Sequence, residues 1–166
     1  IDAECTGGIQ PTAPKDLKIE FIGDSITCGY GVDDEVKEHH FSTATENATK
    51  TYAFKTAENL DADWSFVSFS GHGIISGYTD NGQKQTQQTV PPYYAKLGRS
   101  YGSKSGDFLV QDKDWDFNSF VPDVIVINLG TNDDSYCKGD DEKAMEYAEA
   151  YEQFIEEVRS HNSDAQ

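Results

Sequence analysis

The chain has 166 residues, enough for one compact domain with a single hydrophobic core. Its 30 acidic residues against 13 basic ones give a formal charge of −17. This negative field disfavours nucleic acid and anionic membrane surfaces as partners, because both would be repelled, and it suits neutral substrates. The same charge is also typical of a solvated surface that resists aggregation. No apolar run approaches the roughly 18 residues of a membrane span.

The first 16 residues have no apolar period and are rich in Gly, Pro and Thr, so they are interpreted as a linker or the tail of an upstream domain. The chain begins at Ile1 without a leader, which indicates a processed or truncated end. Its three cysteines, Cys5, Cys28 and Cys137, fit no zinc motif. The sequence leaves three possibilities for these cysteines. Two of them form a disulfide and the third is a free thiol, one of them pairs with a cysteine outside this chain, or all three are buried thiols.

The first half of the chain contains two predicted strands. Residues 17–23 form a short apolar run that ends at a glycine, which predicts a buried strand, and the polar pair that follows can start a short helix. Apolar residues recur at helical spacing over 48–60. Residues 64–70, WSFVSFS, predict the second strand.

The second half begins with a long polar segment, residues 76–120, which predicts a functional loop or an insertion with small elements of its own. The β-branched run at 122–130 predicts a third strand, too apolar for a solvent face, and 141–159 has one apolar helical face. This alternation predicts a parallel α/β sheet. Such sheets usually have about five or six strands, so residues 17–166 are interpreted as the N-terminal part of a domain whose sheet is incomplete in this chain.

The predicted strand ends carry residues suited to acyl transfer. Ligands of open parallel sheets bind beyond the carboxyl ends of the strands, so Ser25, Gly71 and Asn132 should reach one rim. Ser25 offers a hydroxyl nucleophile. Its own N–H, the N–H of Gly71 and the amide of Asn132 offer donors for the resulting oxyanion. Singly, these residues could be a helix cap and turn residues, but their joint placement favours an oxyanion hole.

The blocks around these residues resemble a known family. GDSIT after the first strand, the glycine after the second and GTND after the third are similar to the first three blocks of the SGNH, or GDSL-like, hydrolases. The longer segments IEFIGDSITCGYG, FSTATENATKTYA and VINLGTNDDS resemble family 2 of the carbohydrate esterases, the acetyl xylan esterase type. The resemblance covers about residues 18–159. It implies a three-layer, flavodoxin-like fold, deacetylation of carbohydrate, and a secreted or cell-surface location.

The resemblance also implies roles for individual residues. Ser25 would be the nucleophile, Gly71 and Asn132 would complete the oxyanion hole, and neither a cofactor nor a metal would be needed. Asp24, beside the nucleophile, is expected to fix the turn through local hydrogen bonds rather than to take part in catalysis. The other motif residues expected to support the site are Gly23, Gly130 and Asp133.

The sequence departs from the family in its histidines. The family's general base lies in an Asp-x-x-His block near the end of the domain, and this sequence has no such block. His161 is the only late histidine, and it lies on a tail. His72 is expected at the surface or behind the reacting groups, and His39 and His40 are expected to be exposed without a carboxylate partner. Because a serine hydroxyl without a base is a poor nucleophile, the base is expected from a missing segment of the same polypeptide or from a second chain.

Two other functions stay open on the sequence alone. A scaffold of this family that has lost its base would be a carbohydrate-binding module without catalysis, since fold does not fix function. An esterase acting on a lipid, a thioester or an arylester would use the same nucleophile, although a pocket for long acyl chains should be apolar. Aromatic residues that could stack on sugar rings or belong to the core are Tyr30, Tyr78, Trp115 and Tyr136.

Overall fold

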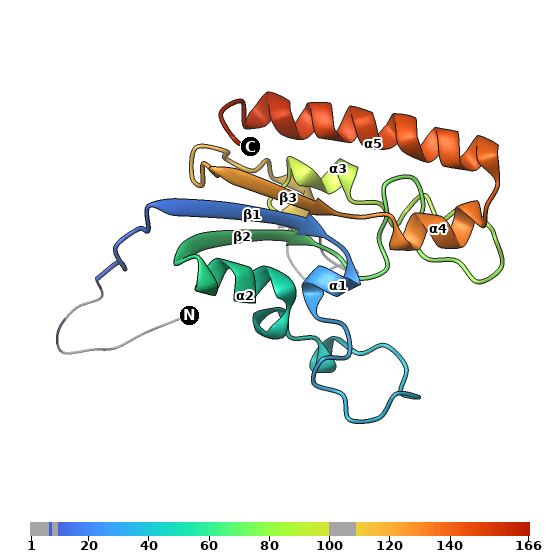
Figure 1. The fold of residues 1–166 in the computed structure, drawn as a ribbon, viewed down its shortest axis with the longest axis horizontal. Coiled ribbons are helices and arrows are strands. Elements are labelled where there is room, and N and C mark those ends of the chain that lie inside the picture. Colours follow the sequence, from blue (N-terminus) through green and yellow to red (C-terminus); the bar gives the residue numbers. More distant parts are fainter. Residues whose placement is uncertain (1–6, 8–9, 100–108) are drawn as a thin grey trace.

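The structure is a computed structural model, and it describes residue 7, residues 10–99 and residues 109–166. Within these residues the chain forms one parallel sheet with helices on both faces, which confirms the α/β fold predicted from the alternation (Figure 1). The strands follow the order β2-β1-β3 and are β1 (Leu17–Gly23), β2 (Ala62–Ser68) and β3 (Val124–Asn128).

Helix α2 (Tyr52–Asn59) covers one face of the sheet, and α3 (Pro91–Tyr94) and α5 (Asp141–His161) lie over the other (Figure 1). Helices α1 (Ser25–Cys28) and α4 (Thr131–Cys137) follow β1 and β3 directly. The remaining elements are short 3-10 turns: η1 (Thr43–Thr45), η2 (Ala48–Lys50) and η3 (Val110–Asp112). Of these elements, α3 and η3 lie within the long polar segment 76–120, which therefore contains small elements of its own, as predicted.

The central strand β1 is buried on both faces because apolar side chains alternate between two cores. Ile19 and Phe21 pack with the small residues Ala53 and Ala57 of α2. On the opposite face Ile22 belongs to the core beneath α5. A strand covered on both sides needs an almost continuous apolar run, which explains why residues 17–23 are so readily predicted.

The predicted bounds differ from the observed ones where pairing with β1 sets the limits. Gly23, the last residue of β1, pairs with Ser68 and with Asn128, so β2 and β3 end there rather than two residues later. At its start β2 extends back to Ala62, the partner of Leu17. The predicted helix over 48–60 is divided into η2 and α2, because the residue between them has an extended backbone.

The outer edge of β3 has little cover, which makes all five of its residues only half-buried rather than fully enclosed as predicted. Gln166 pairs with this edge: its N–H donates to the carbonyl of Asp123 at 3.0 Å, and its carbonyl accepts from the N–H of Ile125 at 2.9 Å. The two hydrogen bonds of Gln166 go to the residues on either side of Val124, which is the pattern of neighbouring parallel strands. The sheet is thus incomplete in this chain, and Gln166 occupies the place where a fourth parallel strand would begin.

A carboxylate is buried inside this sheet. Glu20 of β1 is 4% exposed, and its Oε2 accepts a hydrogen bond from the Tyr94 hydroxyl at 3.0 Å. That hydroxyl in turn accepts from Nδ2 of Asn162 at 2.7 Å, so the network joins β1, α3 and the end of α5. Burial raises the pKa of Glu20 above its ordinary value of 4.5, against the opposing effect of the hydrogen bond from Tyr94.

We expect the Glu20→Gln change to reduce the pH dependence of stability in the full-length protein. The raised pKa means that the folded state holds this proton more tightly than the unfolded state. The contribution of Glu20 is therefore complete below pH 4.5 and is lost as the pH rises through the folded-state pKa. The amide does not titrate, yet its oxygen can still accept from Tyr94. Between about pH 4 and about pH 7, the melting temperature should fall less for this variant than for Glu149→Gln, which changes an exposed residue and serves as the control. Parallel curves for the two variants would contradict the prediction.

Candidate active site

The three predicted site residues follow the carboxyl ends of three neighbouring strands, at one edge of the sheet (Figure 1). Ser25 is the first residue of α1, Gly71 lies in the turn after β2, and Asn132 is in the first turn of α4. Hydrogen bonds link the segments, because Nδ2 of Asn132 lies 2.8 Å from the carbonyl of His72 and 3.3 Å from Oδ2 of Asp24. The structure therefore brings the three blocks together on one rim, as the sequence predicts.

Ser25 is half-buried at a tight turn between strand and helix. The turn requires glycine at position 23, since a Cβ atom there would lie 2.0 Å from Oγ1 of Thr27. Asp24 caps the helix, its Oδ1 accepting from the N–H of Ile26 at 3.0 Å, which is the local hydrogen bond expected of it. The cap role thus belongs to Asp24 and not to Ser25. In the part of the chain that the structure describes, the Ser25 hydroxyl makes no hydrogen bond.

Gly71 has a φ of +79°, in the left-handed region that favours glycine. A Cβ atom here would meet no atom within 4 Å, so its conformation rather than crowding requires the glycine. Its carbonyl accepts from the N–H of Tyr78 at 2.9 Å. Its own N–H donates to no acceptor among residues 10–99 and 109–166, and it remains available to a bound group.

Asn132 is buried, and its Nδ2 lies within hydrogen-bond distance of two protein acceptors, the carbonyl of His72 and Oδ2 of Asp24. The sequence predicted this amide as an oxyanion donor without predicting these acceptors. The contact with Asp24 is the longer one, at 3.3 Å. Burial raises the pKa of Asp24, and the charge of nearby Asp133 raises it further.

Asp133 holds the segment after β2 in place through buried hydrogen bonds. Its side chain is buried, and its carboxylate accepts from the N–H groups of Ile74, Ile75 and Ser76 at 2.8–3.0 Å. The sequence gives no sign of these three consecutive N–H groups as partners of Asp133, because they lie where the turn after the second predicted strand meets the long polar segment, outside every predicted strand and helix. The carboxylate thereby fixes the segment that follows Gly71. Gly130, the other supporting motif residue, is the N-cap of α4.

None of the four histidines, all of which the structure describes, hydrogen-bonds to Ser25. His72 is fully buried rather than at the surface; its Nδ1 lies 3.0 Å from the carbonyl of Ser70, and burial lowers its pKa. His161 stacks on the ring of Phe117, with centroids 4.0 Å apart, at the far end of α5.

The remaining two histidines lie in the exposed loop after α1. His39 and His40 are both exposed, as predicted. His39 has a carboxylate partner that the sequence analysis did not identify, because its Nδ1 lies 2.9 Å from Oδ1 of Asp34. Among the described residues, no group of three or more His, Cys, Asp or Glu side chains is placed to hold a metal ion.

Cys28 and Cys137 carry free thiols and do not bond to each other, and burial raises the pKa of both. Cys5 lies outside the described residues. No helix in the described part of the chain combines the length and the apolar character that a bilayer crossing requires.

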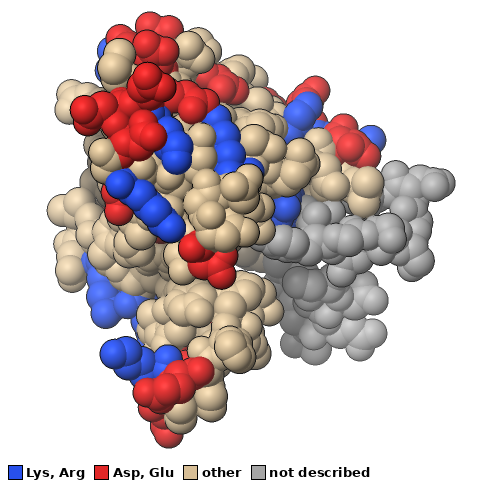
Figure 2. Space-filling view, turned by 90° about the vertical axis from the view of Figure 1, so that its right-hand side faces the viewer, with Lys and Arg blue, Asp and Glu red and all other residues tan. Residues whose placement is uncertain are grey.

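Of the four aromatic residues considered for sugar stacking, Tyr30 and Tyr78 are exposed, whereas Trp115 and Tyr136 are half-buried. Seen from the strand-end side, charged side chains of both signs lie around uncharged surface (Figure 2).

Curated relatives are esterases by name. The cellulase/esterase CelE of Acetivibrio thermocellus is 41% identical over 155 residues, which cover 92% of this chain and 17% of that protein. An acetylxylan esterase / glucomannan deacetylase of Cellvibrio japonicus is 32% identical over 158 residues, which cover 90% of this chain and 40% of that protein. The chain thus spans less than half the length of either relative.

Solved structures agree with this grouping. An acetyl xylan esterase from the rumen bacterium Butyrivibrio proteoclasticus matches 95% of this chain with a TM-score of 0.82 and 28% identity, over 47% of its own chain. A family two carbohydrate esterase from Clostridium thermocellum, in complex with cellohexaose, matches 95% with a TM-score of 0.72 and 35% identity, over 43% of its own chain. The model of the GDSL-like lipase/acylhydrolase family matches residues 21–166. The chain therefore belongs to the GDSL-like lipase/acylhydrolase family.

Proposed function

We propose that this chain carries the nucleophile of an ester hydrolase that removes acetyl groups from carbohydrate, either acetyl xylan or an acetylated oligosaccharide. The observation that carries the proposal is the shared rim: Ser25 is half-buried there, and the amide of Asn132 hydrogen-bonds to Asp24, next to Ser25, and to the carbonyl of His72, next to Gly71. The names of the relatives, which include acetylxylan esterases, support the substrate class. The complex of one relative with cellohexaose supports a carbohydrate ligand.

The proposed reaction passes through an acyl-enzyme. The Ser25 hydroxyl attacks the acetyl carbonyl while a general base takes its proton, and the carbonyl oxygen becomes an oxyanion. The N–H groups of Ser25 and Gly71 stabilise that charge, together with the amide of Asn132, which gives up its longer hydrogen bond, 3.3 Å to Asp24, in order to donate to the oxyanion. One such donor typically contributes about a hundredfold or more in rate. The ester C–O bond then breaks, the sugar hydroxyl leaves with the proton from the base, and water hydrolyses the acetyl-serine to acetate.

We propose that the base is a histidine from outside these 166 residues. Two observations support this: none of the four histidines hydrogen-bonds to Ser25, and the Ser25 hydroxyl has no hydrogen-bond partner in the described part of the chain. The edge of β3 supplies a route, because a strand that continued from Gln166 parallel to β3 would reach the same rim. A later segment of the same polypeptide, or a second chain carrying an Asp-x-x-His block, would then complete the site.

A serine-directed fluorophosphonate tests this function in the full-length protein. The reagent should form one covalent adduct, which peptide mass spectrometry should locate on Ser25, and acetate release from acetylated xylan should fall in proportion to labelling. The exposed hydroxyl of Ser160, which donates to the carbonyl of Glu157, is the internal control and should stay unmodified. Acetate release that persists after complete labelling would contradict the proposal. Absence of both adduct and acetate release would favour a binding module.

A further inference from the structure

The loop between α1 and η2 is attached to the candidate active site at both ends. At its start the N–H of Tyr30 donates to the carbonyl of Ser25 at 2.9 Å. At its end the carboxylate of Glu46 accepts from the hydroxyl of Ser70, the residue before the oxyanion-hole glycine. Both ends of this loop are therefore hydrogen-bonded to segments that carry the candidate site residues Ser25 and Gly71.

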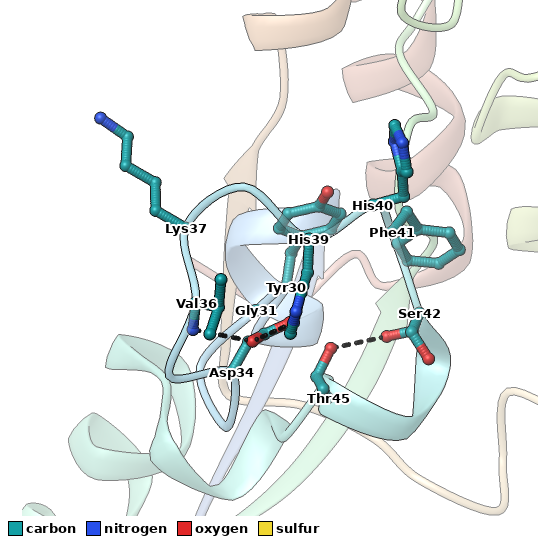
Figure 3. Close-up of a pocket in the computed structure, with 10 residues that line it drawn as sticks. All are labelled: Tyr30, Gly31, Asp34, Val36, Lys37, His39, His40, Phe41, Ser42 and Thr45. Carbon is teal, nitrogen blue, oxygen red and sulfur yellow. Dashed lines mark hydrogen bonds and ion pairs between the residues drawn. The ribbon is translucent and has the colours of Figure 1, made fainter.

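The loop encloses a hollow of about 210 Å³ in which two aromatic rings stack (Figure 3). The rings of Tyr30 and Phe41 are nearly parallel, at 11°, with centroids 5.4 Å apart, yet the two residues are 48% and 52% exposed. The paired Asp34 and His39 side chains lie beside them, and the side chain of Lys37 extends away from the hollow (Figure 3).

The loop has hydrogen bonds of its own that do not involve the two rings. Asp33 accepts from Nδ2 of Asn47 at 2.7 Å and pairs with Lys50, and Oγ1 of Thr45 donates to the carbonyl of Ser42 at 3.0 Å. The exposed stack is therefore not needed to close the loop. Apolar surface left exposed beside polar groups is typical of a binding site.

The chemistry of the hollow fits a sugar ring. The C–H face of a pyranose packs against an aromatic ring, and its hydroxyls hydrogen-bond to carboxylate, imidazole and hydroxyl groups such as those of Asp34, His39 and Ser42. The formal charge of −17 disfavours an anionic ligand. The hollow is smaller than the roughly 300–1,000 Å³ of sites for drug-sized ligands, so it fits one ring rather than a chain.

We propose that the Tyr30–Phe41 hollow binds one neutral pyranose unit of the polysaccharide, next to the unit whose acetyl group reacts at Ser25. This inference rests on the proposed function and adds a specificity site to it. The hollow would increase affinity for an oligosaccharide without taking part in bond breaking. Loss of the rings should therefore affect KM for a carbohydrate ester far more than kcat.

The test compares Phe41→Ala and Tyr30→Ala with the conservative variants Phe41→Tyr and Tyr30→Phe in the full-length protein. On acetylated xylooligosaccharides the alanine variants should raise KM about tenfold, the value of one aromatic stacking contact, with kcat nearly unchanged. The conservative variants should keep KM near that of the wild type. On nitrophenyl acetate, which has no sugar, the rise in KM should be absent.

Direct binding separates this inference from the proposed function. Calorimetric titration of the Ser25→Ala protein with unacetylated xylohexaose should show affinity reduced about tenfold by Phe41→Ala and restored by Phe41→Tyr. If the wild-type protein releases no acetate, the proposed function is wrong, but this titration still shows whether the Tyr30–Phe41 hollow binds a sugar. Equal binding with and without the ring, or an equal loss of activity on both esters, would overturn the inference.

Discussion

Replacing Ser25 with alanine is expected to reduce kcat for acetate release from acetylated xylan by about four to six orders of magnitude. No other group in the proposed reaction can form the acyl-enzyme, so the residual rate would come from binding and the oxyanion donors alone. Stability should be almost unchanged, within about 0.5 kcal/mol, because the side chain is half-buried and Asp24 caps the helix. Acetate release and thermal melting of the full-length protein measure the two effects.

Ser160→Ala is the matched control for this change. Its hydroxyl is exposed on α5 and donates to a carbonyl of its own helix, so both activity and melting temperature should remain those of the wild type. Full activity in Ser25→Ala would show that the rim is not the reaction site. A large fall in melting temperature with little loss of kcat would instead assign Ser25 a structural role.

The strands and the rim are predictable from sequence because their signals are local. β1 is an apolar run that ends at Gly23, and β2 and β3 are recognised from apolar runs of their own, although pairing opposite Gly23 ends both strands two residues earlier than predicted. The blocks after each strand then place Ser25, Gly71 and Asn132 on one edge without knowledge of any contact.

The supporting contacts are not predictable in this way, because they join distant segments. Asp133 accepts from N–H groups 57 to 59 residues earlier, and nothing in the local sequence of Ile74, Ile75 and Ser76 indicates which side chain their N–H groups contact. The same applies to His72: the sequence leaves open whether it lies at the surface or behind the reacting groups, and the structure shows that its ring is fully buried. The cause is the folding of residues 71–77 onto α4, a tertiary contact that overrides local pattern.

Asp133→Ala is expected to lower the free energy of unfolding by about 3–5 kcal/mol, because three buried N–H groups would lose their acceptor. Relief of the repulsion between Asp133 and Asp24 offsets only part of this cost, since it is a secondary cause of the raised pKa of Asp24. Activity should fall as well. The segment after Gly71 would no longer be fixed, and an oxyanion donor acts only when it is held in place.

Urea unfolding and acetate release by the full-length protein test this prediction against two variants. The neighbouring Asp134 is exposed, so Asp134→Ala removes the same charge from the same helix and should change stability by no more than about 0.5 kcal/mol. Asp133→Asn keeps one oxygen that can accept but turns a donating NH₂ towards the N–H of Ile74, so its loss should be intermediate. The order wild type, Asp134→Ala, Asp133→Asn, Asp133→Ala in decreasing stability follows from the acceptors alone. If Asp133→Ala were as stable as Asp134→Ala, the carboxylate would not anchor the rim, and the position of Gly71 would have to depend on the hydrogen bonds of its own turn.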